Sequence, residues 1–166
     1  MVTRQNFQPP STQFLLKLGY RFARALFNND NMISENYLWR AVVINALEDC
    51  MILRSDRKSA TLKTTAHNWI LSYCRDFEQI CNWAQLDPDE VIYAYRGAIK
   101  KKEVTFTQRQ LLWFEYNKLS RKTRQEPDHR YKNSMKKEMT NIRLKVKVLQ
   151  DVQNDYVSTL FLNALS

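Results

Sequence analysis

The chain has 166 residues, enough for one domain that buries a core without disulfide or metal staples. Hydrophobic residues make up 44% and aromatic residues 12%, which argues against wholesale disorder. The only glycines are Gly19 and Gly97, and no proline lies between Pro10 and Pro88, so sheet-rich folds and glycine-rich phosphate loops are disfavoured. We therefore expect an all-α protein.

The formal net charge of +9 is concentrated in the C-terminal part of the chain. Residues 1–99 have a net charge of +1, whereas residues 100–147 contain 15 Lys or Arg and five acids, a net charge of +10. This asymmetry predicts a polyanionic partner. Nucleic acid is the commonest such partner, because Lys and Arg contacts release counterions from its phosphates. The alternatives are a solvated face that only aids solubility, an anionic lipid and an acidic protein.

Residues typical of catalytic and metal sites are sparse. The chain has three cysteines and two histidines: Cys50, Cys74, Cys81, His67 and His129. No C-x-x-C occurs, so a zinc site is not expected, and the cysteines are interpreted as small buried residues in a reducing cytosol. Glu48 and Asp49 are adjacent, and adjacent residues of a helix point in different directions. We expect neither an enzyme nor a bound cofactor or metal.

The N-terminal part begins with a polar segment, residues 1–13, that contains Pro9-Pro10 and is expected to be disordered. An amphipathic helix is predicted over residues 14–27, followed by a turn at residues 28–31. Because the first 29 residues hold no acid, an organellar transit peptide is the alternative for this helix. No run approaches the ~18 apolar residues of a membrane span.

Ser34 is predicted to cap a second helix, in which apolar residues spaced four apart extend to Cys50. Residues 54–65 are polar and form either a loop or the start of a helix that continues to Tyr73. The basic residues Arg54, Arg57 and Lys58 could touch phosphates there, although a solvated loop is the favoured interpretation.

Residues 76–99 have the pattern of a helix-turn-helix. In a twenty-residue unit that starts at Phe77, five places must be apolar for two helices to pack at a steep angle. They are occupied by Ile80, Ala84, Leu86, Val91 and Ala94. The fifth place must be small and is Cys81. An ordinary helical hairpin would share part of this pattern and is the alternative.

The ends of these two helices have capping residues. Asp76 is predicted to cap the first helix, and Asp87 the second, with Pro88 in the first turn and Glu90 closing a capping box. The turn requires a residue with positive φ, usually Gly, and this sequence has Gln85 there. A non-glycine residue in that conformation costs on the order of 1 kcal/mol, which is tolerable.

Three segments give the chain a resemblance to a known family: "LWRAVVINALEDC", "AHNWI" and "DFEQICNWAQLDPDEV". Together they resemble the pattern LW-x-A-V, A-x-x-W and D-F-x-x-[VI]-C-x-x-A-x-L-D-P of small, mostly uncharacterised proteins of phages, prophages and bacterial genomes. The resemblance covers roughly residues 38–99 and departs from the pattern at Gln85, where the family has Gly. It implies a helix-turn-helix-like fold and DNA binding, and it does not extend to the basic segment.

The C-terminal part, residues 103–166, is predicted to be a basic helical extension of a helical domain at residues 14–102. Thr107 and Gln110 form a capping box, and the helix after them ends in Arg121, Lys122 and Arg124. Residues 125–137 are charged and are interpreted as a linker. Residues 142–148 alternate like a strand, but apolar steps of three and four favour a long helix over residues 138–164. Its apolar end must pack on its own domain or on a second subunit, as in a homodimer.

We therefore expect a DNA-binding protein, a transcriptional regulator of phage or bacterial type, located in the bacterial cytoplasm or nucleoid. Acids at the start of the second motif helix disfavour phosphate contact there. The predicted duplex contacts lie farther along the chain: Tyr93, Arg96, Lys100, Lys101, Lys102, Arg109, Arg121, Lys122 and Arg124. The alternative is a protein-interaction module in which the acidic helix start binds a basic partner, such as RNA polymerase or another regulator, while the tail holds nucleic acid non-specifically.

Overall fold

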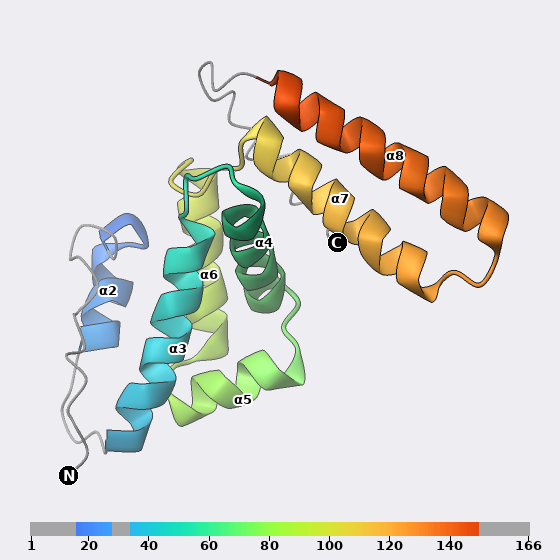
Figure 1. Cartoon of the computed structure of the whole chain (residues 1–166). Helices are drawn as coiled ribbons and strands as arrows, with labels where there is room; N and C mark the ends of the chain where they lie inside the picture. The colour runs from blue at the N-terminus through green and yellow to red at the C-terminus, as the bar shows by residue number, and fades with distance from the viewer. Residues whose placement is uncertain (1–15, 28–33, 150–166) are drawn as a thin grey trace, which may run out of the picture.

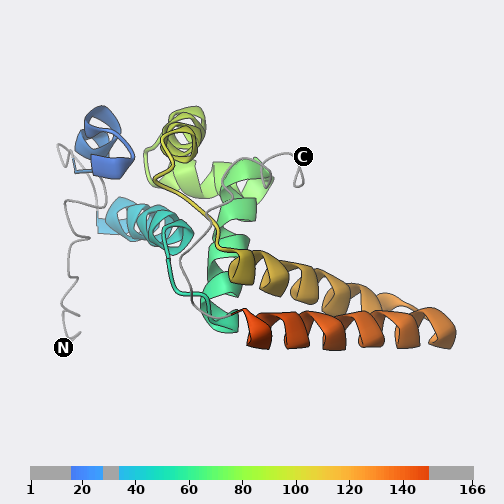
Figure 2. The ribbon, with the colours of Figure 1, turned by 90° about the horizontal axis from the view of Figure 1, so that it is seen from above.

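The computed structural model describes residues 16–27 and 34–149, and within these ranges the protein is all-α. Its elements are the helices α2 (Tyr20–Phe27), α3 (Ser34–Cys50), α4 (Arg57–Leu71), α5 (Arg75–Trp83), α6 (Pro88–Lys100), α7 (Gln108–Gln125) and α8 (His129–Val148). Helices α2 to α6 form a bundle, and α7 and α8 form an antiparallel hairpin that projects away from it (Figures 1 and 2). We call this hairpin the arm.

The core of the bundle lies between α3 and the helices around it. Along α3 the buried positions Arg40, Val43, Ile44, Leu47 and Cys50 recur at helical spacing and form one continuous stripe. The apolar members of this stripe belong to one cluster with side chains from the other four helices of the bundle and from the segment after α6. The expectation of a chain long enough to bury its own core is confirmed for the described residues.

The first described helix starts later than the sequence predicts. Gly19 has a φ of +104°, which L side chains rarely adopt, so the helical turn at residues 16–17 stops there and α2 begins at Tyr20. The prediction of one uninterrupted helix is therefore wrong at residues 18–19. The predicted disorder at residues 1–13 and the turn at residues 28–31 lie outside the described residues.

A buried arginine of α3 joins the ends of two other helices. The Nε of Arg40 donates to the Ala84 carbonyl at the end of α5 (2.9 Å), and its Nη1 donates to the carbonyls of Ala25 (3.1 Å) and Leu26 (3.0 Å) in α2. Carbonyls at helix C-termini have no partners within the helix, and a cation there also complements the helix dipole. Arg40 thereby fixes α2 and the turn after α5 relative to α3.

The turn between α5 and α6 has the backbone that the sequence requires. Gln85 has a φ of +53°, as predicted, and the N–H groups of Gln85 and Leu86 donate to the carbonyls of Asn82 (3.0 Å) and Cys81 (2.9 Å). These two bonds form a Schellman motif. The predicted apolar positions are buried except Ile80, which is partly buried and packs on the core. A helix-turn-helix and an ordinary helical hairpin share these features, so the helix-turn-helix stays a prediction.

The caps of α5 and α6 differ from each other. Asp76 does not cap α5, because it lies within the first turn and Cys74 occupies the N-cap position. Its carboxylate accepts a bond from the indole N–H of Trp69 (2.8 Å). Asp87 caps α6 as predicted, and its carboxylate accepts from the N–H of Asp89 (2.9 Å). The predicted capping box is not formed among the described residues, because Glu90 does not make the reciprocal bond. The acids at this helix start are therefore explained in part as helix caps.

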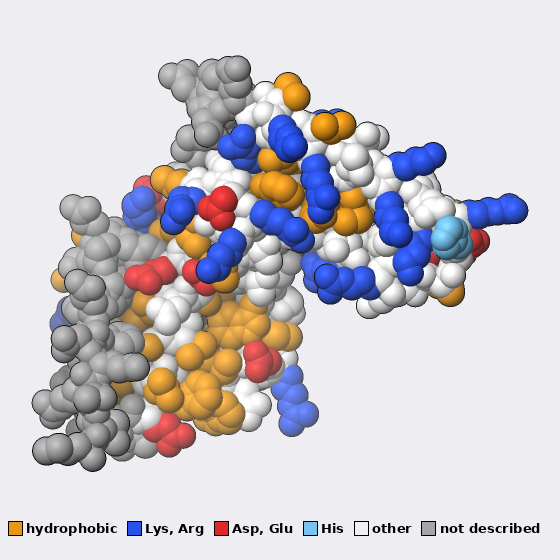
Figure 3. All heavy atoms as spheres, viewed as in Figure 1, with side chains coloured by type: hydrophobic (Ala, Val, Ile, Leu, Met, Phe, Trp, Pro, Cys, Tyr) orange, Lys and Arg blue, Asp and Glu red, His pale blue; other side chains and the backbone are white. Residues whose placement is uncertain are grey.

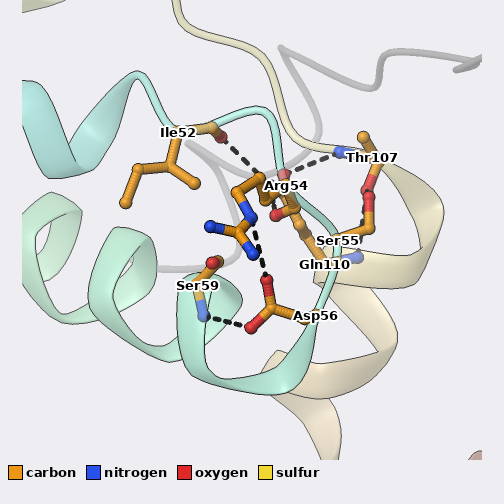
Figure 4. Close-up of polar contacts among 7 residues, drawn as sticks. All are labelled: Ile52, Arg54, Ser55, Asp56, Ser59, Thr107 and Gln110. Atoms are coloured by element: carbon orange, nitrogen blue, oxygen red, sulfur yellow. Dashed lines mark hydrogen bonds and ion pairs between the residues drawn. The ribbon is translucent and has the colours of Figure 1, made fainter.

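A network of polar contacts fixes the arm to the bundle (Figure 4). The predicted capping box is present: the N–H of Gln110 donates to Oγ1 of Thr107 (3.1 Å), and the N–H of Thr107 donates to Oε1 of Gln110 (3.0 Å). The Nε2 of Gln110 also donates to the carbonyls of Ile52 (3.1 Å) and Arg54 (2.8 Å) in the loop between α3 and α4. One buried amide thus caps α7 and ties it to a loop more than 50 residues away in sequence.

The same loop is tied to the bundle by a buried lysine. The fully buried Nζ of Lys63 donates to the carbonyls of Ile52 (2.7 Å) and Thr105 and lies 4.8 Å from the ring centroid of Phe106. The loop itself ends where Asp56 caps α4 by accepting from the N–H of Ser59 (3.0 Å), so α4 starts at Arg57 rather than at the beginning of the polar segment. These bonds satisfy backbone groups that the bundle would otherwise bury without partners.

The arm has a small hydrophobic cluster of its own. Tyr116 of α7 and Ile142 and Val146 of α8 are its buried members. The segment predicted as a linker at residues 125–137 is mostly helical, because α8 already begins at His129 and only residues 126–128 separate it from α7. The choice of helix over strand for residues 142–148 is confirmed. The predicted continuation to residue 164 and its apolar end lie outside the described residues.

Candidate nucleic-acid interface

The arm concentrates positive charge on two helices. Residues 108–148 contain 12 Lys or Arg and four Asp or Glu, a net charge of +8. Within the described ranges the ion pairs are Lys17–Glu103 and Arg54–Asp56, each 3.7 Å, and both lie outside the arm. Figure 3 shows the Lys and Arg side chains spread over this part of the molecule, while acidic side chains gather over the bundle. The positive field of the arm is thus not neutralised by ion pairs among the described side chains.

Three of the predicted contact residues lie on one exposed stripe of α6. Tyr93, Arg96 and Lys100 are exposed at steps of three and four, and the Tyr93 side chain is 82% exposed. Asp89 lies on the same stripe, one turn before Tyr93. Because α6 runs from α5 towards the base of the arm, its basic end faces the arm and its acidic start lies at the opposite end of the bundle (Figure 1).

The three consecutive lysines close the C-terminus of α6. Lys100, Lys101 and Lys102 are all exposed, and Lys102 has a φ of +61° in a second Schellman motif. Its N–H donates to the carbonyl of Ile99 (2.9 Å), and the N–H of Glu103 donates to that of Ala98 (3.0 Å). Cations at this negative end of the helix dipole are stabilised there, and their ammonium groups face solvent.

Arg109 has a different role from the predicted phosphate contact. It is partly buried, and its Nη2 donates to the carbonyls of Val146 (3.1 Å) and Leu149 (2.9 Å) at the end of α8. The guanidinium therefore caps α8 and holds the two helices of the arm together. We do not retain Arg109 among the residues available to a ligand.

Arg121, Lys122 and Arg124, three of the predicted contact residues, are exposed on the outer half of α7. Two of them, Arg121 and Arg124, line a groove together with Arg57, the first residue of α4. In the sequence Arg57 lies in a polar segment, and no local pattern there predicts that it meets Arg121 and Arg124, which lie more than 60 positions away.

A buried tyrosine positions Arg57 at the base of the arm. The Tyr116 ring centroid lies 4.7 Å from the guanidinium carbon of Arg57 and 5.0 Å from that of Arg143 in α8, and Nη2 of Arg143 donates to the Tyr116 hydroxyl. Cation–π contacts of this kind leave most guanidinium N–H donors available. Tyr116 thus orients two cations, one from the bundle and one from the arm.

The groups with strongly shifted pKa values lie in the core and not on this surface. Burial lowers the pKa of Lys63 to about 8 and, together with the nearby Lys63 charge, lowers that of His67 to about 4. Burial raises the pKa of the Cys50 thiol to about 12 and that of Tyr95 well above its usual value. These four groups are closed off from solvent, so we assign them to the architecture of the bundle.

Metal sites and membrane spans are two other features that the described residues could contain. Among the described residues, no three His, Cys, Asp or Glu side chains lie close enough together to hold a metal ion. The described helices also include none with the length and apolar character that crossing a membrane requires.

Comparison with known proteins identifies no relative: no family model matches the chain, and no match was found among the curated proteins or the solved structures. The resemblance to phage and prophage proteins therefore stays an expectation from the sequence.

Proposed function

We propose that this protein binds nucleic acid, and duplex DNA in particular, by holding the phosphate backbone along the arm and at the end of α6. The observation that carries the proposal is the net charge of +8 on the arm without an ion pair among its described side chains. Lys and Arg in such numbers position a protein on phosphates rather than read bases. The contacts we retain are Tyr93, Arg96, Lys100, Lys101, Lys102, Arg121, Lys122 and Arg124.

The finer proposal is a transcriptional regulator of phage or bacterial type that uses α5 and α6 as a helix-turn-helix. It is supported by the resemblance over residues 38–99 and by the exposed Tyr93 and Arg96 on α6. The acidic start of α6 opposes the usual docking, in which the first residues of the second helix enter the major groove. Contacts through the C-terminal half of α6 fit its charges better.

The first experiment measures the affinity of the full chain for a random-sequence duplex by fluorescence anisotropy at several salt concentrations. Each phosphate contact contributes a slope of about −0.9 to log K against log salt, so six to ten contacts would weaken binding ~10³- to 10⁵-fold between 50 and 200 mM salt. Failure to bind even at low salt would overturn the proposal. Selection of bound fragments from genomic DNA then tests for sequence specificity.

A second candidate is a protein-interaction module. The start of α3 and the end of α5 expose Leu38 (61%) and Trp83 (44%), and α6 begins with acids. Aromatic residues are enriched in protein interfaces. Binding of purified RNA polymerase that is lost in Asp89→Asn/Glu90→Gln and in Trp83→Ala, with the fold intact, would favour this candidate. Unchanged binding in both variants would reject this surface.

A further inference from the structure

A groove of about 400 Å³ lies between α4 and α7 and extends along the outer half of α7. We call it the α4–α7 groove, and its polar lining includes Arg57, Thr61, Thr65, Asn68, Arg121 and Arg124. Its volume lies in the lower part of the ~300–1,000 Å³ range of ligand pockets. The lining combines three guanidiniums with hydroxyl and amide groups and contains no Asp or Glu.

The bundle side of the groove is held in place by side-chain contacts. Nη2 of Arg57 donates to Oδ1 of Asn117 (3.4 Å), and Nδ2 of Asn117 donates to Oγ1 of Thr61 (2.8 Å). The Thr61 hydroxyl in turn donates to the Arg57 carbonyl (2.8 Å). Together with the Tyr116 ring, these contacts orient the Arg57 guanidinium before any ligand arrives, which reduces the entropy lost on binding.

The arm side of the groove provides two further guanidiniums. Arg121 and Arg124 are three residues apart on α7, so they lie on neighbouring turns of one helix face. Neither takes part in an ion pair of the described residues. Three guanidiniums around one hollow without a carboxylate repel one another, and an anion with several oxygen acceptors would relieve that repulsion. Phosphate suits them because guanidinium binds it through two parallel hydrogen bonds.

We propose that the α4–α7 groove binds phosphodiester groups of a nucleic-acid strand that lies along the arm, with Arg57, Arg121 and Arg124 as the phosphate ligands. The inference rests on the proposed function and names its anchoring site. A strand is favoured over a free phosphate because α7 carries two further exposed cations within three residues of Arg121, Lys118 and Lys122.

The decisive comparison is between two variants that lose the same charge. The triple variant Arg57→Gln/Arg121→Gln/Arg124→Gln removes the groove cations, and the control Arg130→Gln/Lys136→Gln/Lys137→Gln removes three from α8, all of them exposed. We expect the groove variant to weaken duplex binding at least tenfold more than the control at the same salt concentration. Equal losses would overturn the groove site while leaving the proposed function intact. If the wild type binds no duplex at low salt, both fall.

Because Arg57 also contacts Tyr116, the double variant Arg121→Gln/Arg124→Gln checks the result without disturbing that contact. It should retain the wild-type helical circular dichroism and urea midpoint and still lose more affinity than Arg130→Gln/Lys137→Gln. A double variant that binds as tightly as its control would contradict the site.

An NMR titration distinguishes a strand from a free phosphate. Addition of a 12-base-pair duplex should shift the side-chain amide of Asn68 and the arginine Nε–H signals of the groove. Shifts there with inorganic pyrophosphate but not with duplex would overturn the proposal and assign the groove to free phosphates. No shift with either ligand would also overturn it.

Discussion

The buried imidazole of His67 should make the stability of this protein sensitive to acid. The side chain is 1% exposed, its Nδ1 lies 2.6 Å from the Tyr95 hydroxyl, and the rings of Tyr95 and Phe106 meet it edge to face. Burial first, and the Lys63 charge second, lower the pKa of His67 to about 4. The folded protein therefore keeps this imidazole neutral well below the pH at which an exposed histidine takes up a proton.

The size and sign of the effect follow from this pKa. In the unfolded chain the pKa returns to ~6.5, so between pH 6.5 and 4 the unfolded state binds more protons than the folded state. The free energy of unfolding then rises with pH across this window. A shift from ~6.5 to about 4 corresponds to about 3 kcal/mol, fully present above pH 6.5 and lost as the pH falls to 4.

Urea denaturation followed by circular dichroism between pH 4 and 7.5 measures this term. His67→Gln removes the buried titration, and His129→Gln is the matched control, because His129 is the other histidine of the chain and is exposed. The advantage of wild type over His67→Gln should shrink by about 3 kcal/mol from pH 7 to pH 4. His129→Gln should follow the wild type. Parallel pH profiles for wild type and His67→Gln would refute the reasoning.

Three further predictions concern helix ends and the base of the arm. Gln85→Gly should raise the free energy of unfolding by about 0.5–1 kcal/mol in urea denaturation, because glycine adopts the positive φ of this turn without strain. Gln110→Leu should lower it by about 2–3 kcal/mol, because it leaves two carbonyls of the α3–α4 loop and the N–H of the α7 cap without partners. Arg109→Gln should increase hydrogen exchange at the end of α8, where the guanidinium now caps two carbonyls.

Each of these has a nearby control. Gln79→Gly, in the middle of α5, should lower stability by about 1 kcal/mol, so a gain at both glutamines would contradict the turn argument. Gln108→Leu, at an exposed position of α7, should change stability little, and a loss equal to that of Gln110→Leu would contradict the specific role of the buried amide. Arg130→Gln should leave exchange at the end of α8 unchanged, since Arg130 lies at the other end of that helix.

Features that depend on neighbours in sequence could be predicted. The capping box of Thr107 and Gln110, the Asp87 cap and the positive φ of Gln85 all involve residues within a few positions of one another. The choice of helix for residues 142–148 was also open to sequence reasoning, because the apolar period there continues beyond the apparent alternation.

The start of α8 was missed although a signal was present. An apolar stripe with steps of four and three runs along α8, and its members are buried or partly buried: Met135, Met139, Ile142 and Val146. The charged residues between them led to the interpretation of a linker. A helix that packs on one neighbour needs only a narrow apolar stripe, so a high charge content is compatible with it.

Contacts between distant segments could not be predicted. The sequence gives no local indication that Arg109 caps a helix that ends 40 residues later, or that Arg57 shares a groove with Arg121. Both are arginines in basic surroundings, and only the packing of α7 on α4 and α8 separates a structural guanidinium from one that is available to a ligand. Of the predicted phosphate contacts, Arg109 is the one that this packing removes.

The charge of the arm also has a cost for the arm itself. Two helices held together by the cluster around Tyr116 carry like charges at close range, and their mutual repulsion opposes the hairpin. Dissolved salt screens this repulsion, so it should strengthen the hairpin while it weakens attachment to a polyanion. A polyanion that binds only the folded hairpin would itself shift the folding equilibrium towards that state, as any ligand of a native state does. In the cell, the fraction of protein bound to the polyanion and the fraction with a folded arm would then rise together.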